Sequence, residues 1–197
     1  MSRAALDKLT EQFPQAVQGS HDFRGDETAL LAPASLKEVC RFLRDDRDLR
    51  FDMLTDATAV DYLLEPGRSP AARFEVVYHL YSTSQAKRLR LKVQLGEPGA
   101  AGEPEVDSLC ELWPIANWLE REIWDMYGIR FRGHPELRRI LLYEEFVGHP
   151  LRKDYPKEKR QPLARRPEPE IAMVLAQRGP ARALVTIQTQ APSAEKR

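Results

Sequence analysis

The sequence predicts an α+β fold, in which a small antiparallel sheet carries helices on one face and is followed by an extended C-terminal arm. Residues 51–95 contain three runs rich in Val, Leu, Tyr and Phe with short breaks between them, which is typical of strands joined by hairpins. The stretches before and after these runs repeat apolar residues at three- and four-residue intervals, as amphipathic helices do. Beyond residue 156 the composition changes to Pro, Arg, Lys and Glu, which predicts a segment without a core of its own.

The N-terminal third begins with a short helix. Residues 6–13 have helical spacing, and Pro14 ends the helix. A short strand from about Ala16 and another over 28–31 follow. The phrase Ser35-Leu36-Lys37-Glu38 has the form of a capping box, and the apolar stripe behind it predicts a helix over 36–46.

The sheet comes mainly from three runs, at 51–64, 73–83 and 87–95. In the last run, apolar residues alternate with Arg, Lys and Gln, which indicates a half-buried antiparallel strand. The break at 65–71 contains Pro and Gly and the break at 84–86 is short, so both suit hairpin connections in a meander.

A second capping box, Ser108-Leu109-Cys110-Glu111, predicts the start of a helix that runs to Tyr127, with an irregularity at Pro114. Gly128 is expected to end this helix as its C-terminal cap. The predicted organisation is therefore an α+β domain over 1–130, an extended signature segment over 131–156 and a Pro- and charge-rich arm over 157–197.

The composition of the chain argues against several classes of function. Lys plus Arg and Asp plus Glu both number 30, so no net charge attracts nucleic acid or an anionic membrane surface. Apolar runs such as 171–176 are far shorter than the roughly 20 residues that span a bilayer. The N-terminus has no secretory signal, which predicts that the chain stays in the cytoplasm. Cys40 and Cys110 have no Cys or His at short spacing, so buried thiols are expected rather than a metal or iron-sulfur site.

The most informative stretch lies between residues 117 and 156. It contains Glu-Arg-Glu at 120–122, Trp-Asp-Met-Tyr-Gly at 124–128, His-Pro-Glu-Leu-Arg-Arg-Ile-Leu at 134–141 and Gly-His-Pro-Leu-Arg-Lys-Asp-Tyr-Pro at 148–156. These phrases, in this order, resemble the signature of the C-subunit family of NADH-quinone oxidoreductase, or respiratory complex I. The signature residues expected at a partner interface are Glu120, Arg121, Glu122, Asp125, Gly128, His134, Pro135, Arg138, Arg139, Gly148, His149, Pro150, Arg152, Lys153, Asp154, Tyr155 and Pro156.

The resemblance implies a structural subunit of the peripheral arm, without catalytic residues or a cofactor of its own. Its expected partners are the other complex I subunits, especially the large quinone-site subunit and the adjacent iron-sulfur subunits. FMN and the iron-sulfur clusters would lie in those partners, and NADH and quinone would meet the chain only through the complex. The expected location is the cytoplasmic face of the inner membrane. The motif also resembles a domain of membrane-bound hydrogenases and related dehydrogenases.

The charged residues of the predicted helix favour a partner interface independently of the family resemblance. Arg121 and Asp125 stand four residues apart and can pair, and Glu122 and Asp125 share a face. Next to Trp118, Trp124 and Tyr127, such charges suit an interface in which aromatic residues anchor and charges set the register. The alternative is a solvated helix face with core aromatic residues behind it.

A basic band, comprising Arg130, Arg132, Arg138, Arg139, Arg152 and Lys153, raises the question of a nucleic-acid partner. Glu136, Glu144, Glu145 and Asp154 are interleaved with it, and no nucleic-acid-binding motif accompanies it. Pairing of arginines with carboxylates of a protein partner is therefore the favoured interpretation.

Two histidines, His134 and His149, each precede a proline, and together they raise the question of a metal site. No cysteine is expected nearby, and the following prolines force extended backbone, so turn-forming histidines bonded to backbone or carboxylates are favoured. Neither a nucleophile with a placed base nor a Gly-x-Gly-x-x-Gly fingerprint is present. The competing function classes are a structural subunit of an electron-transfer translocase and a stand-alone adaptor or hydrolase on the same fold.

Overall fold

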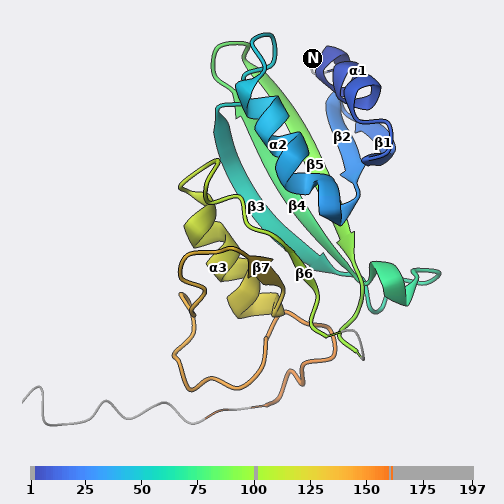
Figure 1. Ribbon diagram of the computed structural model, residues 1–197. Coiled ribbons are helices and arrows are strands. Elements are labelled where there is room, and N and C mark those ends of the chain that lie inside the picture. The colour runs from blue at the N-terminus through green and yellow to red at the C-terminus, as the bar shows by residue number, and fades with distance from the viewer. Residues whose placement is uncertain (1–2, 100–101, 160, 162–197) are drawn as a thin grey trace, which may run out of the picture. The chain divides into compact units, whose positions relative to one another are not determined.

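A five-stranded sheet with the strand order β1-β2-β5-β4-β3 organises the computed structural model (Figure 1). The structure describes residues 3–99, 102–159 and 161. The strands are β1 (Val17–Phe23), β2 (Asp26–Leu31), β3 (Met53–Asp61), β4 (Phe74–Ser82) and β5 (Lys87–Leu95). The helices are α1 (Arg3–Gln12), α2 (Leu36–Asp45) and α3 (Ala116–Tyr127), with 3-10 turns η1 (Pro33–Ser35) and η2 (Pro70–Ala72).

The predicted meander is confirmed, because β3, β4 and β5 pair antiparallel through the two expected hairpins. The expectation of a wholly antiparallel sheet is wrong. β2 pairs with β5 in parallel, in the register Ala29↔Leu91 and Leu31↔Val93. α2 separates β2 from the meander and provides the crossover that a parallel pairing needs.

One face of the sheet carries the core, as the α+β class requires. Leu89, Leu91, Val93 and Leu95 of β5 are all buried, and their partners on β4 include Val76 and Tyr78 on the same face. The same apolar cluster contains Leu6 and Leu9 of α1, Leu36, Val39, Cys40 and Leu43 of α2, and Ala116 and Ile123 of α3. α1, α2 and α3 therefore share the core of this face.

Neither predicted capping box forms. Ser35 precedes α2, but its side chain makes no capping hydrogen bond. Ser108 Oγ instead donates to Glu120 over 2.7 Å, and α3 begins at Ala116 rather than near residue 108. Pro114 lies just before this start, and residues 109–113 form turns. The Ser108 side chain therefore makes a tertiary hydrogen bond to Glu120 instead of the local capping bond that the sequence predicted.

A second, smaller sheet joins the segments that precede and follow α3. β6 (Glu105–Asp107) and β7 (Arg130–Arg132) pair in parallel, with α3 as the connection between them. Gly128 ends α3 in the left-handed conformation at φ 73°, as predicted. After β7 the chain runs back past α3, and residues 133–159, which the structure describes, contain no further helix or strand (Figure 1). The predicted C-terminal arm lies outside the described residues from residue 162 onward.

Candidate functional site

The signature residues gather around α3 and the segment that follows it. α3 buries Glu120, Arg121, Ile123, Asp125 and Met126, whereas Glu122 faces solvent. A buried ionised residue needs partners that replace water, so the hydrogen bonds of the buried charged residues define the structure of the signature segment.

Asp125 binds the chain of residues 139–142. Its carboxylate accepts hydrogen bonds from the backbone N–H groups of Ile140, Leu141 and Leu142 at 3.1, 2.9 and 2.9 Å. It also pairs with Arg139 Nη1 at 2.5 Å. Burial works to raise the pKa of Asp125, but these hydrogen bonds outweigh burial and leave the pKa below its ordinary value.

Two arginines, Arg121 and Arg139, complete this network. Arg139 donates through Nη2 to the carbonyl oxygens of Phe146 and Gly148 at 2.7 and 3.0 Å. Arg121 donates to the carbonyl oxygens of Arg138 and Arg139, both at 3.1 Å. Planar guanidinium groups can satisfy several carbonyl groups at once, which lets an irregular segment pack without a strand partner.

Arg121 and Asp125, which helical spacing allows to pair, do not pair with each other among the described residues. Both side chains turn to the segment after β7, where Arg121 donates to two carbonyl oxygens and Asp125 pairs with Arg139. Glu122 and Asp125, which were expected on one face of the helix, lie in different environments: Asp125 is buried and Glu122 is exposed.

The second half of the signature returns to the C-terminal end of α3. His149 Nδ1 lies 3.0 Å from the carbonyl oxygen of Asp125, and Arg152 Nε donates to the carbonyl oxygen of Tyr127. Arg152 also pairs with Glu103 at 3.0 Å. Burial lowers the pKa of His149, which favours the neutral ring. His149 and Arg152 thus occupy carbonyl groups at the helix end that have no partner within the helix.

A buried ion pair anchors the end of the signature to the main sheet. Arg73 and Asp61 are joined by hydrogen bonds of 3.1 and 3.0 Å, and Arg73 also pairs with Asp154 at 3.0 Å. The Asp61 carboxylate accepts the N–H of Lys153 at 2.8 Å. Burial opposes ionisation of Asp61, yet Arg73 and the backbone donors keep its pKa below the ordinary value.

Sequence reasoning missed Asp61 and Arg73, which lie outside the signature. The available signal was weak: each is a charged residue at the end of an apolar run, Asp61 late in 51–64 and Arg73 at the start of 73–83. Only the fold brings them next to residues 153 and 154.

The signature divides into a hydrogen-bonded inner set and an outer set that faces solvent. The buried or half-buried members are Glu120, Arg121, Asp125, Gly128, His134, Arg139, Gly148, His149, Pro150, Arg152 and Tyr155. The exposed members are Glu122, Pro135, Arg138, Lys153, Asp154 and Pro156. Their role at a partner interface stays a prediction, and the outer set is the part available for it.

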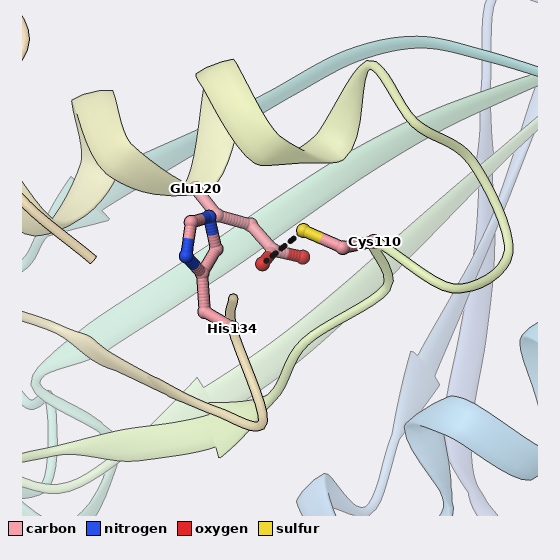
Figure 2. A group of neighbouring side chains, drawn as sticks. All are labelled: Cys110, Glu120 and His134. Carbon is pink, nitrogen blue, oxygen red and sulfur yellow. Dashed lines mark hydrogen bonds between the residues drawn. The ribbon is translucent and has the colours of Figure 1, made fainter. Parts of the chain in front are cut away.

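Cys110, Glu120 and His134 form a separate cluster, in which one potential metal-ligand atom from each residue lies within 4.8 Å of the others (Figure 2). The expectation that no cysteine lies near these histidines is thus wrong for His134. Glu120 accepts hydrogen bonds from Ser108 Oγ and from the Leu109 N–H, both at 2.7 Å. Cys110 Sγ lies 3.5 Å from the same carboxylate.

The donor set fits a metal poorly. Both ring nitrogens of His134 have partners, since Nε2 lies 3.1 Å from the Asn117 carbonyl oxygen and Nδ1 accepts the Glu136 N–H at 3.0 Å. Burial raises the pKa of the Cys110 thiol to about 11, so a metal ion bound there would have to displace a tightly held proton. The geometry favours a hydrogen-bonded cluster, in line with the predicted turn-forming role of His134.

Glu120 should make stability depend on pH. Burial raises its pKa from 4.5 to about 7 in the folded protein. The folded state therefore keeps a proton that the unfolded state releases, and the stability contribution falls as pH rises from about 4.5 to 7. We expect the difference in unfolding free energy between Glu120→Gln and the unsubstituted protein to change with pH. From acidic to mildly alkaline pH it should shift by up to about 3 kcal/mol in favour of the variant.

Urea unfolding at several pH values measures this difference, with the exposed Glu122→Gln as the matched control. Parallel pH profiles for Glu120→Gln and the unsubstituted protein would contradict the expectation.

No helix among the described residues is long and apolar enough to cross a membrane. The family model described as "Respiratory-chain NADH dehydrogenase, 30 Kd subunit" matches residues 29–161. The chain is 45% identical over 152 residues to the C subunit of NADH-quinone oxidoreductase from Geotalea uraniireducens, covering 77% of this chain and 86% of that protein. It is 50% identical over 151 residues to the C subunit of the same enzyme from Roseiflexus sp., covering 77% and 82%.

Two solved structures resemble the fold. The trypsin-resistant fragment (1–134) of Nqo5 superimposes with a TM-score of 0.57 and 29% identity, covering 68% of this chain and 98% of the fragment. A chain of the membrane-bound sulfane sulfur reductase, an archaeal respiratory membrane complex, superimposes with a TM-score of 0.62 and 19% identity, covering 80% and 86%. At that identity the second likeness shows the fold alone.

Proposed function

The chain belongs to the family of the respiratory-chain NADH dehydrogenase 30 kDa subunit, and we therefore propose that it is a structural subunit in the peripheral arm of a proton-translocating NADH-quinone oxidoreductase. Electrons pass from NADH through FMN and iron-sulfur centres of other subunits to quinone. This chain supports assembly around the quinone-site subunit and the adjacent iron-sulfur subunits, at the cytoplasmic face of the inner membrane.

The observation that carries the proposal is the division of the signature into inner and outer sets. The inner network fixes the backbone of residues 138–155 against α3 and the sheet. A segment held in this way presents its outer side chains in one arrangement, which lowers the entropy cost of binding. The two cysteines of the sequence are also too few for the four thiolates that usually hold an iron-sulfur cluster.

Exposed apolar side chains adjoin the outer set. Trp118 of α3 is 63% exposed, Ile115 is 49% exposed, and Leu141 is 60% exposed. Trp118 lies one helical turn before the exposed Glu122. Large apolar groups beside charges suit an interface in which the apolar residues provide the affinity and the charges set the orientation.

Affinity purification of the tagged chain from membranes of its own cell tests the proposal, with mass spectrometry and an NADH-quinone reductase assay on the eluate. Flavin, iron-sulfur and quinone-site subunits in an active eluate would support it. A hydrogenase or sulfur-reductase set would move the chain to a related membrane-bound complex, and recovery of the chain alone would contradict the proposal.

Arg138→Ala should weaken assembly while leaving the fold intact. The Arg138 side chain is 58% exposed and pairs only with the equally exposed Glu136 at 2.9 Å among the described residues. We expect about two- to fivefold less co-purified complex, because a lost charge contact at an interface is worth about 0.5–1 kcal/mol.

Quantitative mass spectrometry of the eluate measures the Arg138→Ala effect. Arg47→Ala, which removes an exposed arginine of the loop after α2, is the matched control. Normal assembly with reduced quinone reductase turnover per complex would argue instead for a role in the reaction.

A further inference from the structure

A groove lies beside the end of the signature, between the loop after β3 and residues 150–157. Its volume is about 420 Å³, and it is lined by Leu64, Pro150, Leu151, Arg152, Lys153, Tyr155 and Lys157. From this lining we infer that the groove is the docking site for a segment of a neighbouring protein of the complex, one that inserts a large apolar side chain and has Asp or Glu next to it. The inference rests on the proposed function, since it assumes that other subunits surround the chain.

Both walls of the groove are fastened to one carboxylate. Asp61 accepts the N–H of Leu63 at 3.0 Å in one wall and the N–H of Lys153 at 2.8 Å in the other. Arg73 holds that carboxylate by two hydrogen bonds. The distance between the walls is therefore set before any partner arrives, as in a preformed binding site.

The groove offers apolar surface that the rest of the described chain does not cover. Leu64 is 74% exposed and Leu151 is 48% exposed. Tyr155 is held in the wall, because its ring stacks on Phe146 at 6.1 Å and Gln161 Nε2 donates to its hydroxyl at 2.8 Å. An apolar side chain between Leu64 and Leu151 would remove both from water.

The charges around the groove select an acidic partner. Lys153 and Lys157 are exposed, and neither ammonium group has an ion-pair partner among the described residues. Arg152 is already paired with Glu103, and Asp154 is paired with Arg73. Two unpaired cations beside an apolar groove favour a carboxylate-bearing segment and disfavour a basic one.

Site-specific photocrosslinking in the assembled complex tests the inference. Benzoylphenylalanine replaces Leu64, whose exposure makes the change tolerable, and the tagged complex is irradiated, purified and analysed by mass spectrometry. The control position is Phe23, which is 62% exposed in the β1–β2 hairpin. The expected result is an adduct at position 64 to a peptide of another subunit that has a large apolar residue next to Asp or Glu.

Charge reversal provides the second measurement. The double variant Lys153→Glu, Lys157→Glu should lower the yield of that adduct by roughly tenfold, since two ion pairs are lost and repulsion replaces them. Arg47→Glu, with the same change of charge per site, should leave the yield unchanged.

Three results would overturn the inference: no adduct at position 64 in a complex of normal composition, an adduct only to lipid or to residues of this same chain, or an adduct yield insensitive to the charge reversal. Failure of the proposed function looks different, because the other subunits would then be missing from the eluate before any irradiation.

Discussion

Asp125→Ala is expected to lower the free energy of unfolding by about 3–5 kcal/mol, the usual cost of breaking a buried ion pair from one side. The substitution leaves the guanidinium of Arg139, whose side chain is only 10% exposed, without its carboxylate. It also removes the acceptor of three consecutive backbone N–H groups, at residues 140–142. A buried donor without a partner is costly because it has given up its bond to water.

Urea denaturation of the purified chain, followed by tryptophan fluorescence, measures this loss, and Trp124 provides a local signal because the Arg139 guanidinium lies 5.7 Å from its ring. Glu122→Ala removes an exposed carboxylate from the same helix and should change stability by less than about 0.5 kcal/mol. Equal, small effects of the two substitutions would show that the network around Asp125 adds nothing to stability.

Gly128→Ala is expected to cost about 3–4 kcal/mol, from two separate sources. The backbone of Gly128 is left-handed at φ 73°, which disfavours any residue with a Cβ. A Cβ at this position would also lie 2.6 Å from ring atoms of His149 and in collision with Arg152 Nη2. Both side chains are held by carbonyl groups at the end of α3, so neither can move without losing a hydrogen bond.

Gly133→Ala separates the two sources of that cost. Gly133 has nearly the same φ, 77°, but a Cβ there would meet nothing within 4 Å. It should therefore cost only the conformational part, about 1–2 kcal/mol. Thermal and urea unfolding of both variants gives the difference directly. If Gly128→Ala lowered the unfolding free energy no more than Gly133→Ala, the close packing of His149 and Arg152 on the helix end would contribute nothing to stability.

The signature residues stabilise the fold of this chain as well as offering the surface that we propose for a partner. The sequence predicts that its charged residues face a partner, whereas in the described chain many of them bind backbone groups of the chain itself. Arg121, Asp125 and Arg139 hold an irregular segment against α3, and His149 and Arg152 hold its continuation against the helix end. Loss of assembly after substitution of an inner residue could therefore follow from local unfolding, so the exposed Arg138 is the cleaner probe of an interface.

Local patterns in the sequence were sufficient to predict several elements of the fold. The alternation in residues 87–95 predicts β5 because one strand face meets the core, and the spacing in 36–46 predicts α2 because one helix face does. Gly128 was predictable as a helix end because a left-handed cap favours glycine. The signature between residues 117 and 156 was enough to identify the family, which the family model and the relatives confirm.

The partners of the polar side chains depend on the complete fold and could not be predicted from local sequence. The parallel pairing of β2 with β5 joins strands far apart in the sequence, and no local pattern encodes it. Glu120 takes Ser108 from the predicted capping box, and Asp125 takes Arg139 rather than Arg121, which stands only four residues away. Local patterns determine which face of an element is buried. A buried charge instead needs partners that replace its lost water, and folding alone brings these partners together.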